Sequence, residues 1–367
     1  MFFLSLYKKK VSEEVPHRKI RIKDIAEQAG VSTGTVDRVL HKRGEVSLET
    51  RKKVLRIAEK LEYKPNFVAR TLASKKEFHF GVLIPDASNS NPYWEAPLKG
   101  ILKAQNELQS YGVRLSIKTF SLTNIGDFAQ KSSKLLELKP DGLLLAPLFY
   151  SASTKFLDKC SVLSLPVVFI DAQLKYSNHL SYIGQNSCQA GFVAGRLLGM
   201  GQADNSRFAV FNIASERDQL HHFNERDKGF REFFKEKVSN NEIISYDIHG
   251  ATSARLNEIL LDYQRSSAGL DGIFVTSAKS HQVAKELEKL GMNSVRLVGF
   301  DLVKQNVKYL DLEIIDFLIS QQPEEQGYLG IQTLYTALAL KQRVSTLKST
   351  PVDIITKENI KQYLACK

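Results

Sequence analysis

The chain has 367 residues, which is enough for two or three domains that each bury a core. Hydrophobic residues make up 43% and charged residues 25%, as in an ordinary globular protein, and no apolar run approaches the roughly 20 residues that span a bilayer. The net charge of +11 is concentrated at one end: residues 1–76 hold 19 Lys and Arg against 9 Asp and Glu, which leaves +1 for the rest. These values argue against a membrane protein and favour a basic head that binds nucleic acid.

The first residues and the cysteines indicate the cellular compartment. Residues 1–7 are apolar, but basic residues follow rather than precede them and no small-residue cleavage site is present, so we expect no signal peptide. Cys160, Cys188 and Cys366 are scattered and lack metal-ligand spacing. They are typical of free thiols in a reducing compartment, and we expect a cytoplasmic protein that needs no metal or cofactor.

Residues 22–40 have the pattern of two short helices joined by a tight turn. Apolar residues at helical spacing mark the first helix: Ile22, Ile25, Ala26 and Ala29. Gly30 interrupts this run where a positive φ would be needed, and Ser32 can cap the second helix. Val36 and Val39 would then face the first helix. The pattern is typical of a helix-turn-helix, whose second helix can lie in a DNA major groove, although an ordinary helix corner shares it.

A third helix and a short linker follow this pair. Ser47 can cap the third helix, and an apolar stripe indicates the face that closes a three-helix core: Val54, Ile57, Ala58 and Leu61. Pro65 ends the module. Residues 66–76 have helical propensity but are too few to form a stable isolated helix, so they are either a plain linker or a hinge that folds on a partner or on DNA.

From residue 78 onward, apolar strands alternate with helices. We expect strands at 80–85, 113–120, 141–146, 166–171, 207–212, 243–248, 271–275 and 295–301. We expect helices at 93–110, 124–138, 187–199, 226–237, 252–265 and 280–290. This alternation predicts parallel sheets covered on both faces. Asp141-Gly142 and Asp271-Gly272 hold like positions in the two halves, so we predict two similar lobes with a ligand cleft between them.

Over residues 20–355 the sequence resembles the lac-repressor (LacI/GalR) family of bacterial transcription regulators. The residues that carry the resemblance in the head are Ile25-Ala26, Ala29-Gly30-Val31-Ser32, Thr35-Val36, Arg38-Val39, Val46-Ser47, Thr50-Arg51, Val54, Tyr63, Pro65-Asn66, Val68-Ala69-Arg70 and Leu72. The two-lobed part is similar to periplasmic sugar-binding proteins of the ribose-binding type. The resemblance implies a small all-α helix-turn-helix head plus an α/β two-lobed domain like periplasmic binding proteins, with two parallel Rossmann-like sheets.

The same resemblance implies a division into domains. The expected segments are a disordered basic arm (1–19), the helix-turn-helix domain (20–65), a hinge helix (66–77), the effector-binding domain (78–356) and a tail (357–367). Within the effector-binding domain we expect a first lobe of residues 78–180 with 302–321, and a second lobe of residues 181–301 with 322–356.

By resemblance, the DNA-contacting residues would be Ser32, Thr33, Gly34, Thr35, Arg38, His41, Asn66, Ala69, Arg70 and Leu72. Arg38 is the best candidate for a bidentate contact to guanine, and Leu72 for an apolar wedge in the minor groove. Two residues depart from the family pattern. Gly34 brings no side chain to a position that often reads a base, and Asp37 puts a carboxylate where a small residue is usual. The operator sequence therefore cannot be copied from a relative.

The resemblance also implies an effector site made by Asn91, Tyr93, Trp94, Asp171, Arg226, Ser277, Asp301 and Gln321. Sugar C–H faces stack on aromatic rings, and planar Asp, Asn, Arg and Gln groups bind adjacent hydroxyls in pairs. Alternatives remain for several of these residues. Trp94 can equally be a core aromatic, and Asp171 and Asp301 can be helix caps. Arg217 or Asp218 can take the place of Arg226.

One stretch near the effector site departs from the ribose-binding pattern. Residues 276–279, Thr-Ser-Ala-Lys, stand where that pattern has Asn-Asp, so Ser277 would take the Asn role. This difference leaves the identity of the sugar open.

Together these features predict a homodimeric transcription regulator, a repressor, that binds a double-stranded DNA operator and responds to a small carbohydrate or sugar derivative. The alternative is a sugar-binding transport or receptor module without a DNA role, against which the basic head argues. An enzyme is not expected, because the sequence has no Walker A loop, Gly-x-Ser-x-Gly elbow, metal cluster or Gly-x-Gly-x-x-Gly motif.

Overall fold

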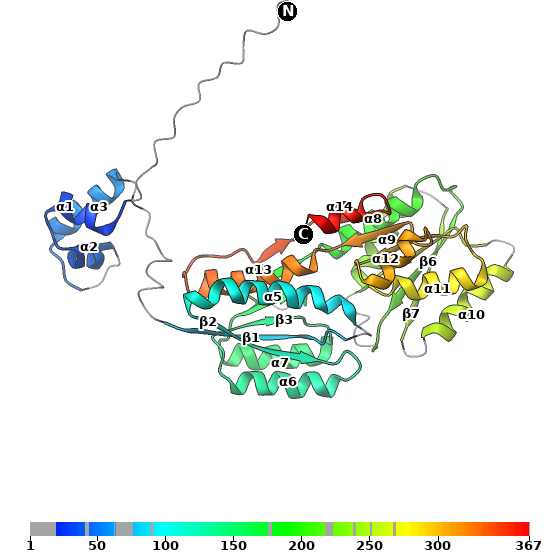
Figure 1. The fold of residues 1–367 in the computed structure, drawn as a ribbon, viewed down its shortest axis with the longest axis horizontal. Coiled ribbons are helices and arrows are strands. Elements are labelled where there is room, and N and C mark those ends of the chain that lie inside the picture. Colours follow the sequence, from blue (N-terminus) through cyan, green and yellow to red (C-terminus); the bar gives the residue numbers. More distant parts are fainter. Residues whose placement is uncertain are drawn as a thin grey trace, which may run out of the picture. The chain divides into compact units, whose positions relative to one another are not determined.

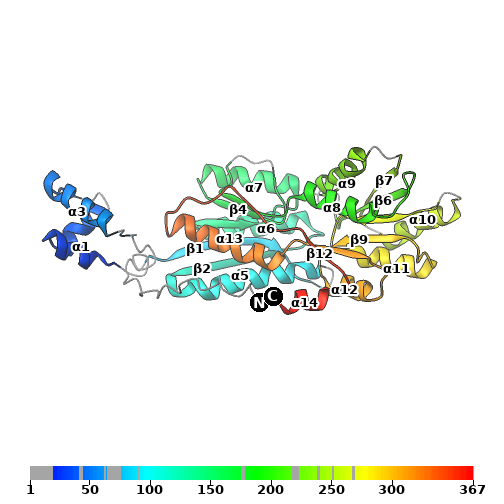
Figure 2. The same ribbon diagram turned by 90° about the horizontal axis from the view of Figure 1, so that it is seen from above.

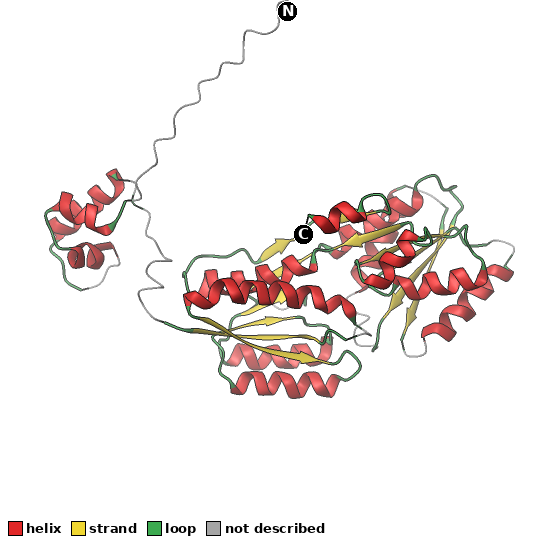
Figure 3. Cartoon of the chain, viewed as in Figure 1, coloured by secondary structure: helices red, strands yellow, loops and turns green. Residues whose placement is uncertain are grey.

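The computed structural model describes residues 20–40, 44–61, 63, 76–88, 91–174, 178–216, 223–237, 240–249, 252–266 and 269–366. The chain divides into two compact units, residues 1–70 and 71–367. The first unit is helical, and the second contains both helices and strands (Figure 1, Figure 3). None of the helices in the described ranges has the length and apolar content that crossing a membrane requires.

Three helices form the first unit: α1 (Ile22–Ala29), α2 (Thr33–Leu40) and α3 (Leu48–Lys60). Gly30 closes the turn between α1 and α2 with a left-handed φ of 64°, and the Val31 backbone N–H donates to the Ala26 carbonyl at 3.1 Å. Ser32 caps α2, because its hydroxyl accepts the Thr35 backbone N–H at 3.1 Å. The predicted pair of helices, the glycine and the cap are therefore confirmed.

The helices enclose a small apolar core. Its buried members are Ile25, Ala26, Ala29, Val36, Val39, Val54 and Ala58. Ile57 and Leu61 pack against this core but remain partly exposed. The start of α3 is fixed by Ser47, whose hydroxyl accepts the Thr50 backbone N–H at 3.3 Å. The third helix closes the head as predicted.

Two six-stranded sheets form the second unit, with the strand orders β11-β5-β4-β3-β1-β2 and β12-β10-β9-β8-β6-β7. The first sheet contains β1 (Phe78–Pro85), β2 (Val113–Phe120), β3 (Gly142–Leu145), β4 (Val167–Ile170), β5 (Ser181–Gly184) and β11 (Leu347–Ser349). The second contains β6 (Arg207–Ile213), β7 (Glu242–Ile248), β8 (Gly272–Val275), β9 (Arg296–Phe300), β10 (Phe317–Ser320) and β12 (Asp353–Ile355). Neighbouring strands are parallel except for β10 and β12, so the predicted α/β class is confirmed.

Helices cover both faces of each sheet. On the first sheet, α5 (Glu95–Leu108) and α13 (Pro323–Leu338) lie on one face, and α6 (Ile125–Glu137) and α7 (Tyr150–Val162) on the other (Figure 1). On the second, α8 (Ser187–Gly199) and α9 (Asn224–Glu236) lie opposite α10 (Thr252–Arg265), α11 (Ser280–Leu290) and α12 (Lys304–Asp311) (Figure 2). Short 3-10 turns at Pro92–Trp94 and Gln109–Tyr111 flank α5, and α14 (Ile360–Ala365) is the last helix. Each sheet with its covering helices is called a lobe below.

The two lobes repeat the same connectivity, which explains the Asp-Gly repeat in the sequence. In the first lobe, the Asp141 carboxylate accepts the backbone N–H of His79 at 2.8 Å. In the second, Asp271 accepts the backbone N–H of Arg207 at 2.7 Å. In both cases the residue before the third strand fastens the first strand of the same lobe. The predicted internal symmetry is confirmed.

The predicted assignment of segments to lobes is wrong in three places. Residues 181–184, assigned to the second lobe, form β5 in the first sheet. Residues 302–321, assigned to the first lobe, contain β10, which pairs with β9 in the second sheet. Residues 322–356, assigned to the second lobe, add α13 and β11 to the first. The first two crossings between the lobes come one short strand later in the chain than expected. The reason is that β5 joins the first sheet, and β10 the second, before the chain crosses.

The predicted tail is only partly a tail. Within residues 357–367, α14 buries Ile360, which is 2% exposed. The Tyr363 hydroxyl bonds to the Asp353 carboxylate at 2.5 Å and to the Ser320 hydroxyl at 3.1 Å. The helix therefore belongs to the second lobe, next to the ends of β10 and β12.

One buried side chain joins the three connections between the lobes. The chain crosses after β5, after β10 and after β11. Gln185 follows β5, is 2% exposed, and donates through its amide to the carbonyls of Ser320 at 3.2 Å and Pro351 at 2.9 Å. These carbonyls belong to the other two crossings. Gln185 thus links the three crossings, because it belongs to the first and bonds to the other two.

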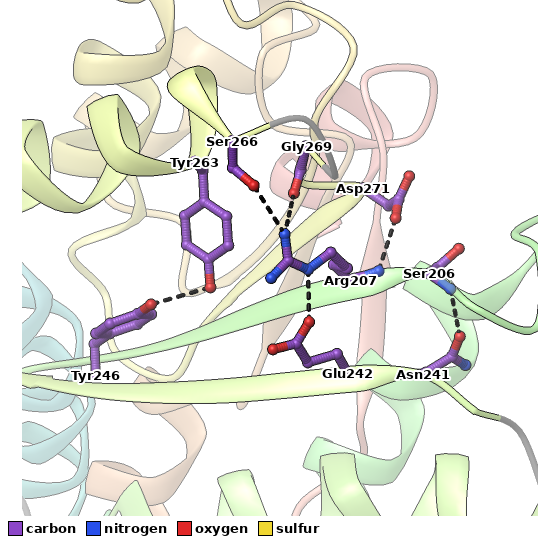
Figure 4. Close-up of polar contacts among 9 residues, drawn as sticks. All are labelled: Ser206, Arg207, Asn241, Glu242, Tyr246, Tyr263, Ser266, Gly269 and Asp271. Carbon is purple, nitrogen blue, oxygen red and sulfur yellow. Dashed lines mark hydrogen bonds and ion pairs between the residues drawn. The ribbon is translucent and has the colours of Figure 1, made fainter.

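A polar cluster fastens the amino ends of the central strands in the second lobe (Figure 4). The Arg207 guanidinium bonds to the Glu242 carboxylate at 2.6 Å, and the Tyr246 and Tyr263 hydroxyls lie 3.0 Å apart. Ligands bind parallel sheets at the opposite, carboxyl ends of the strands. We therefore interpret this cluster as structural.

In each lobe, two helices approach closely at glycines. Gly191 and Gly229 bring α8 and α9 together, and Gly100 and Gly327 do the same for α5 and α13. A Cβ at any of these four positions would overlap a backbone carbonyl of the facing helix. The four glycines therefore set the distance between the paired helices.

Replacing Gly229 with Ala should destabilise the protein, because the new methyl group would overlap the carbonyl of Cys188. We expect the free energy of unfolding to fall by about 1–3 kcal/mol, measured by urea denaturation. Gly126→Ala is the matched control, since that helical position faces only the Asn124 side chain. Equal stability of the Gly229→Ala variant and the wild type would contradict the close approach.

Candidate functional site

A cavity between the two lobes of the second unit contains every effector residue named from the sequence. Its volume is about 100 Å³, and about 690 Å³ when the open solvent at its mouth is counted. Its lining includes Asn91, Tyr93, Trp94, Asp171, Arg226, Ser277, Asp301 and Gln321. These residues come from six separate stretches of the chain. Their convergence was predicted only through the family resemblance.

Two aspartates mark equivalent points in the two lobes. Asp171 follows β4 and Asp301 follows β9, and each has a φ of 67°. A left-handed backbone is uncommon in residues other than glycine, and aspartate tolerates it better than most. Both side chains are buried, with 6% and 3% exposure. The fold therefore aims one carboxylate from each lobe into the cavity.

Asp171 is held by a tyrosine of its own lobe. The Tyr93 hydroxyl donates to the Asp171 carboxylate at 2.5 Å, and the Gln326 amide oxygen accepts the Asp171 backbone N–H at 2.9 Å. Burial, followed by the negative charges of Asp171 and Asp301, raises the pKa of Tyr93, so the phenol keeps its proton. Burial also raises the pKa of Asp171, while Tyr93 and the charge of Arg226 lower it.

Arg226 and Gln321 connect Asp301 to the crossing after β10. Arg226 is 2% exposed, and its guanidinium stacks over the Phe300 ring at 3.8 Å. It donates to the Thr276 carbonyl at 2.5 Å and to the Gln321 amide oxygen at 3.2 Å. The Gln321 amide nitrogen in turn donates to Asp301 at 3.1 and 3.2 Å. Within the part of the chain that the structure describes, Arg226 Nε and Ser277 Oγ are buried without a hydrogen-bond partner.

Trp94 is both a core residue and part of the cavity lining. It is 3% exposed, belongs to the core of the first lobe, and meets the Tyr93 ring edge-on at a centroid distance of 5.1 Å. Tyr93 is the more exposed of the two rings. The structure therefore favours Tyr93 over Trp94 as the surface on which a ligand could stack.

Sequence reasoning missed three residues on the second-lobe side of the cavity. Lys279 and His281 line it, and Asn306 positions them. Asn306 donates to the carbonyls of Ala278 and Asp301 at 3.1 and 3.0 Å, and its side-chain oxygen accepts the His281 backbone N–H at 2.8 Å. The unusual stretch at 276–279 was the available signal, but the lysine in it was not assigned a role.

Burial perturbs both cationic side chains of this group. It lowers the pKa of Lys279, whose ammonium donates to the Ser215 hydroxyl at 3.2 Å. Burial also lowers the pKa of His281; the hydrogen bond to Asn306 opposes this shift and the charge of Lys279 adds to it. A half-buried cation therefore faces the cavity beside an imidazole that tends to be neutral.

The head presents a polar surface along α2. Ser32, Thr33, Gly34 and Arg38 are exposed and Thr35 is partly exposed. The Arg38 Nε donates to the Gly34 carbonyl at 3.3 Å, which holds the side chain along the helix. Among the described residues its terminal nitrogens have no partner, so they remain available for a base edge. His41, Asn66, Ala69, Arg70 and Leu72 lie outside the described residues, as do Arg217 and Asp218.

Asp37 differs in its surroundings from its exposed neighbours. It is partly buried, and burial together with the charge of Asp37 raises the pKa of the Tyr63 phenol. Its carboxylate is therefore near Tyr63, just beyond α3.

Comparison with known proteins agrees with this geometry. Residues 21–66 match the bacterial regulatory proteins of the lacI family, and residues 80–342 match the periplasmic binding protein domain. A ribose operon repressor from Halalkalibacterium halodurans is 30% identical over 290 residues, covering 76% of this chain and 80% of the relative. The chain belongs to the lacI family of bacterial regulatory proteins. This lacI-family chain is thus a DNA-binding transcription regulator rather than an enzyme.

Two further comparisons concern parts of this regulator. Catabolite control protein A from Streptococcus mutans is 49% identical over 82 residues, which is 22% of this chain and 24% of the relative. The structure of a Bacteroides fragilis protein assigned to the LacI transcriptional regulators superposes with a TM-score of 0.71 at 27% identity. It covers 78% of this chain and 100% of that protein.

In this lacI-family regulator, replacing Arg38 with Ala should weaken operator binding by about 1–3 kcal/mol and erase the preference at one base pair. The variant lacks the guanidinium on α2 whose terminal nitrogens have no partner among the described residues and can donate to a base edge. The measurement is fluorescence anisotropy on duplexes selected from a random pool.

Arg56→Ala is the control, because Arg56 is exposed on α3, on a surface that we expect to be solvated or to face phosphates. That variant should lose affinity evenly for all duplexes and show a shallower salt dependence. An unchanged base preference in Arg38→Ala would contradict the assignment.

Proposed function

We propose that this regulator is a repressor whose operator affinity is controlled by a small carbohydrate or sugar derivative bound between the lobes. The observation that carries the proposal is the cavity itself. Paired carboxylates, an amide, a guanidinium and an aromatic ring converge there, and two buried polar atoms, Arg226 Nε and Ser277 Oγ, have no partner. Buried polar groups without partners are costly, so a ligand rich in hydroxyls would satisfy them.

The name of the ribose operon repressor relative supports a carbohydrate effector. Adjacent sugar hydroxyls match the spacing of carboxylate and amide oxygens, and the Tyr93 ring offers an apolar face. In our assignment, Asp171 and Tyr93 bind the ligand from the first lobe, while Arg226 and Asp301 bind it from the second. Asn91, Trp94, Ser277 and Gln321 complete the site.

We propose that ligand binding acts on DNA affinity through the relative position of the lobes. A ligand that touches both lobes favours the arrangement in which both sets of contacts are made. Gln321, a proposed ligand contact, lies in the crossing after β10. Gln185 belongs to the crossing after β5 and bonds to the other two crossings. Closure would therefore move the crossings together and change how two copies present their heads to DNA.

We also propose a homodimer that works in the cytoplasm, where its operator lies, without a membrane contact. Two copies related by a two-fold axis would place two α2 helices in successive major grooves of a near-palindromic operator. In this proposal His41, Asn66, Ala69, Arg70 and Leu72 add contacts beside those of α2. A light-scattering mass of two chains in solution, and a doubled half-site in the selected DNA, would support it.

Replacing Asp301 with Asn should weaken effector binding tenfold or more while leaving operator affinity without ligand unchanged. The amide keeps the shape of the side chain but replaces one acceptor oxygen by a donor and removes the charge. Calorimetric titration with the sugar that gives the largest thermal shift measures the loss.

Asp262→Asn, an exposed position on α10, is the control for the loss of one negative charge. Wild-type affinity in Asp301→Asn would remove Asp301 from the site. Operator affinity that is the same with and without every sugar bound would overturn the proposed function.

Replacing Gln185 with Ala should reduce the effect of the ligand on operator affinity more than it reduces ligand binding. The variant leaves the Ser320 and Pro351 carbonyls without their shared donor, so the three crossings can move separately. It should also lower the free energy of unfolding by about 1–3 kcal/mol. Operator titrations with and without ligand give the coupling, and Gln189→Ala, on the exposed first turn of α8, is the control. Full coupling in Gln185→Ala would show that the amide plays no part.

A further inference from the structure

The second-lobe side of the cavity carries a cation that no part of the described structure neutralises. Lys279 lines the cavity in the loop between β8 and α11, and among the described residues its ammonium donates to the Ser215 hydroxyl, at 3.2 Å. No described carboxylate forms an ion pair with it, and burial alone lowers its pKa. A charge that is removed from water without a counter-charge raises the free energy of the folded state. Removing one partner from a buried ion pair has the same effect. This arrangement is what a site for an anion would have before its ligand arrives.

A second, independent observation lies two residues earlier in the same loop. Ser277 is 7% exposed and lines the cavity, and its hydroxyl has no hydrogen-bond partner. A hydroxyl donates readily to an anionic oxygen, and such charge-assisted bonds are about twice as strong as neutral ones. The serine and the lysine together therefore offer a donor and a positive charge to one ligand group.

His281 extends this group of donors, and its orientation follows from Asn306. The Asn306 amide nitrogen donates to three carbonyls, those of Ala278, Phe300 and Asp301. Its oxygen is therefore the atom that faces the His281 ring, so the Nδ1 at 2.9 Å must carry the proton. This fixes the ring and leaves its Nε2 as the atom that can still change its protonation.

Different cations act on the carboxylates and on the imidazole of the cavity. Arg226 is the charge that acts on Asp171, and the same guanidinium is joined through Gln321 to Asp301. Lys279 acts instead on His281. The cavity lining thus combines acceptors suited to hydroxyl groups with donors and a positive charge.

We propose that the effector is a carbohydrate with one anionic substituent, a phosphate ester or a carboxylate, which binds at Lys279 and Ser277 while its hydroxyls bind at Asp171 and Asp301. The inference rests on the proposed function and specifies the ligand class of the same cavity. A phosphate ester and a sugar acid share the feature that the site recognises, an anionic oxygen next to a ring of hydroxyls. Both offer the Ser277 hydroxyl an acceptor and the Lys279 ammonium a counter-charge.

The test compares neutral sugars with their anionic derivatives on the full-length protein. D-ribose and D-glucose are each paired with their phosphate monoesters, and D-glucose and D-galactose with glucuronate and galacturonate. Inorganic phosphate controls for non-specific anion binding. Thermal shift ranks the ligands, since a ligand that binds only the folded state raises the melting temperature, and calorimetry gives the affinities. We expect a phosphate ester or a sugar acid to bind at least tenfold more tightly than its neutral parent; which of the two does so identifies the source of the anion.

Lys279→Met removes the charge while keeping an apolar stem of similar length, and Lys285→Met, at an exposed position on α11, is the matched control. We expect Lys279→Met to lose about ten- to hundredfold in affinity for the anionic ligand and to bind the neutral parent as the wild type does. Without ligand the variant should melt no lower than the wild type, because it lacks an unneutralised half-buried cation. That measurement separates a lost contact from a misfolded chain.

Two results would overturn the inference. If neutral sugars bind as tightly as their anionic derivatives and Lys279→Met changes neither, the anion site does not exist, while the proposed carbohydrate effector remains. If no sugar in either form raises the melting temperature or changes operator affinity, the proposed function fails together with this inference.

Discussion

The arrangement of the effector cavity depends on one buried guanidinium. Arg226 is only 2% exposed, and a buried guanidinium is tolerable only where acceptors and an aromatic face surround it. The Phe300 ring, the Thr276 carbonyl and the Gln321 amide supply these. They come from the end of β9, the end of β8 and the crossing after β10. One side chain therefore determines how three parts of the cavity wall meet.

The position of Arg226 depends in turn on the pairing of α8 with α9. The Arg226 carbonyl lies against Gly191 of α8, where any larger residue would overlap it. The first lobe repeats this device with Gly100 and Gly327 at the contact of α5 with α13. The lobes also repeat the left-handed aspartates and the Asp-Gly anchors. The cavity is thus formed where two copies of one architecture face each other, which explains why each contributes one carboxylate.

Much of this architecture could be predicted from the sequence, because each strand is short, apolar and bounded by a clear helix. The limits 113–120, 187–199, 252–265 and 280–290 agree with β2, α8, α10 and α11. The strands β5, β10, β11 and β12 were not predicted. β5 and β10 have four residues each, and nothing local shows which sheet a four-residue strand will join. The assignment of segments to lobes failed at these strands, because sheet membership is decided by the free edge of the neighbouring strand.

The effector residues could be named only because a family pattern located them, since they are far apart in sequence. What the pattern could not supply was the role of residues that depart from it. Lys279 stands in a stretch recognised as unusual, yet its partial burial and the absence of a described carboxylate partner are properties of the folded chain. The same holds for Asp37, whose proximity to Tyr63 was not readable from α2 alone.

The departures at Lys279 and Asp37 bear in the same way on effector recognition and on DNA recognition. The family pattern specifies that α2 meets DNA and that the cavity binds a small molecule, since those features follow from the shared fold. In our proposals, the operator and the effector are selected by side chains of α2 and of the cavity lining. In the head, Gly34 brings no side chain to α2 and the charge of Asp37 acts on Tyr63, and Arg38 is the side chain that we predict to reach a base edge. In the cavity, Lys279 and Ser277 add a positive charge and a donor to a site otherwise suited to neutral hydroxyls. The proposed effector specificity therefore lies in residues 276–279, where the sequence leaves the family pattern.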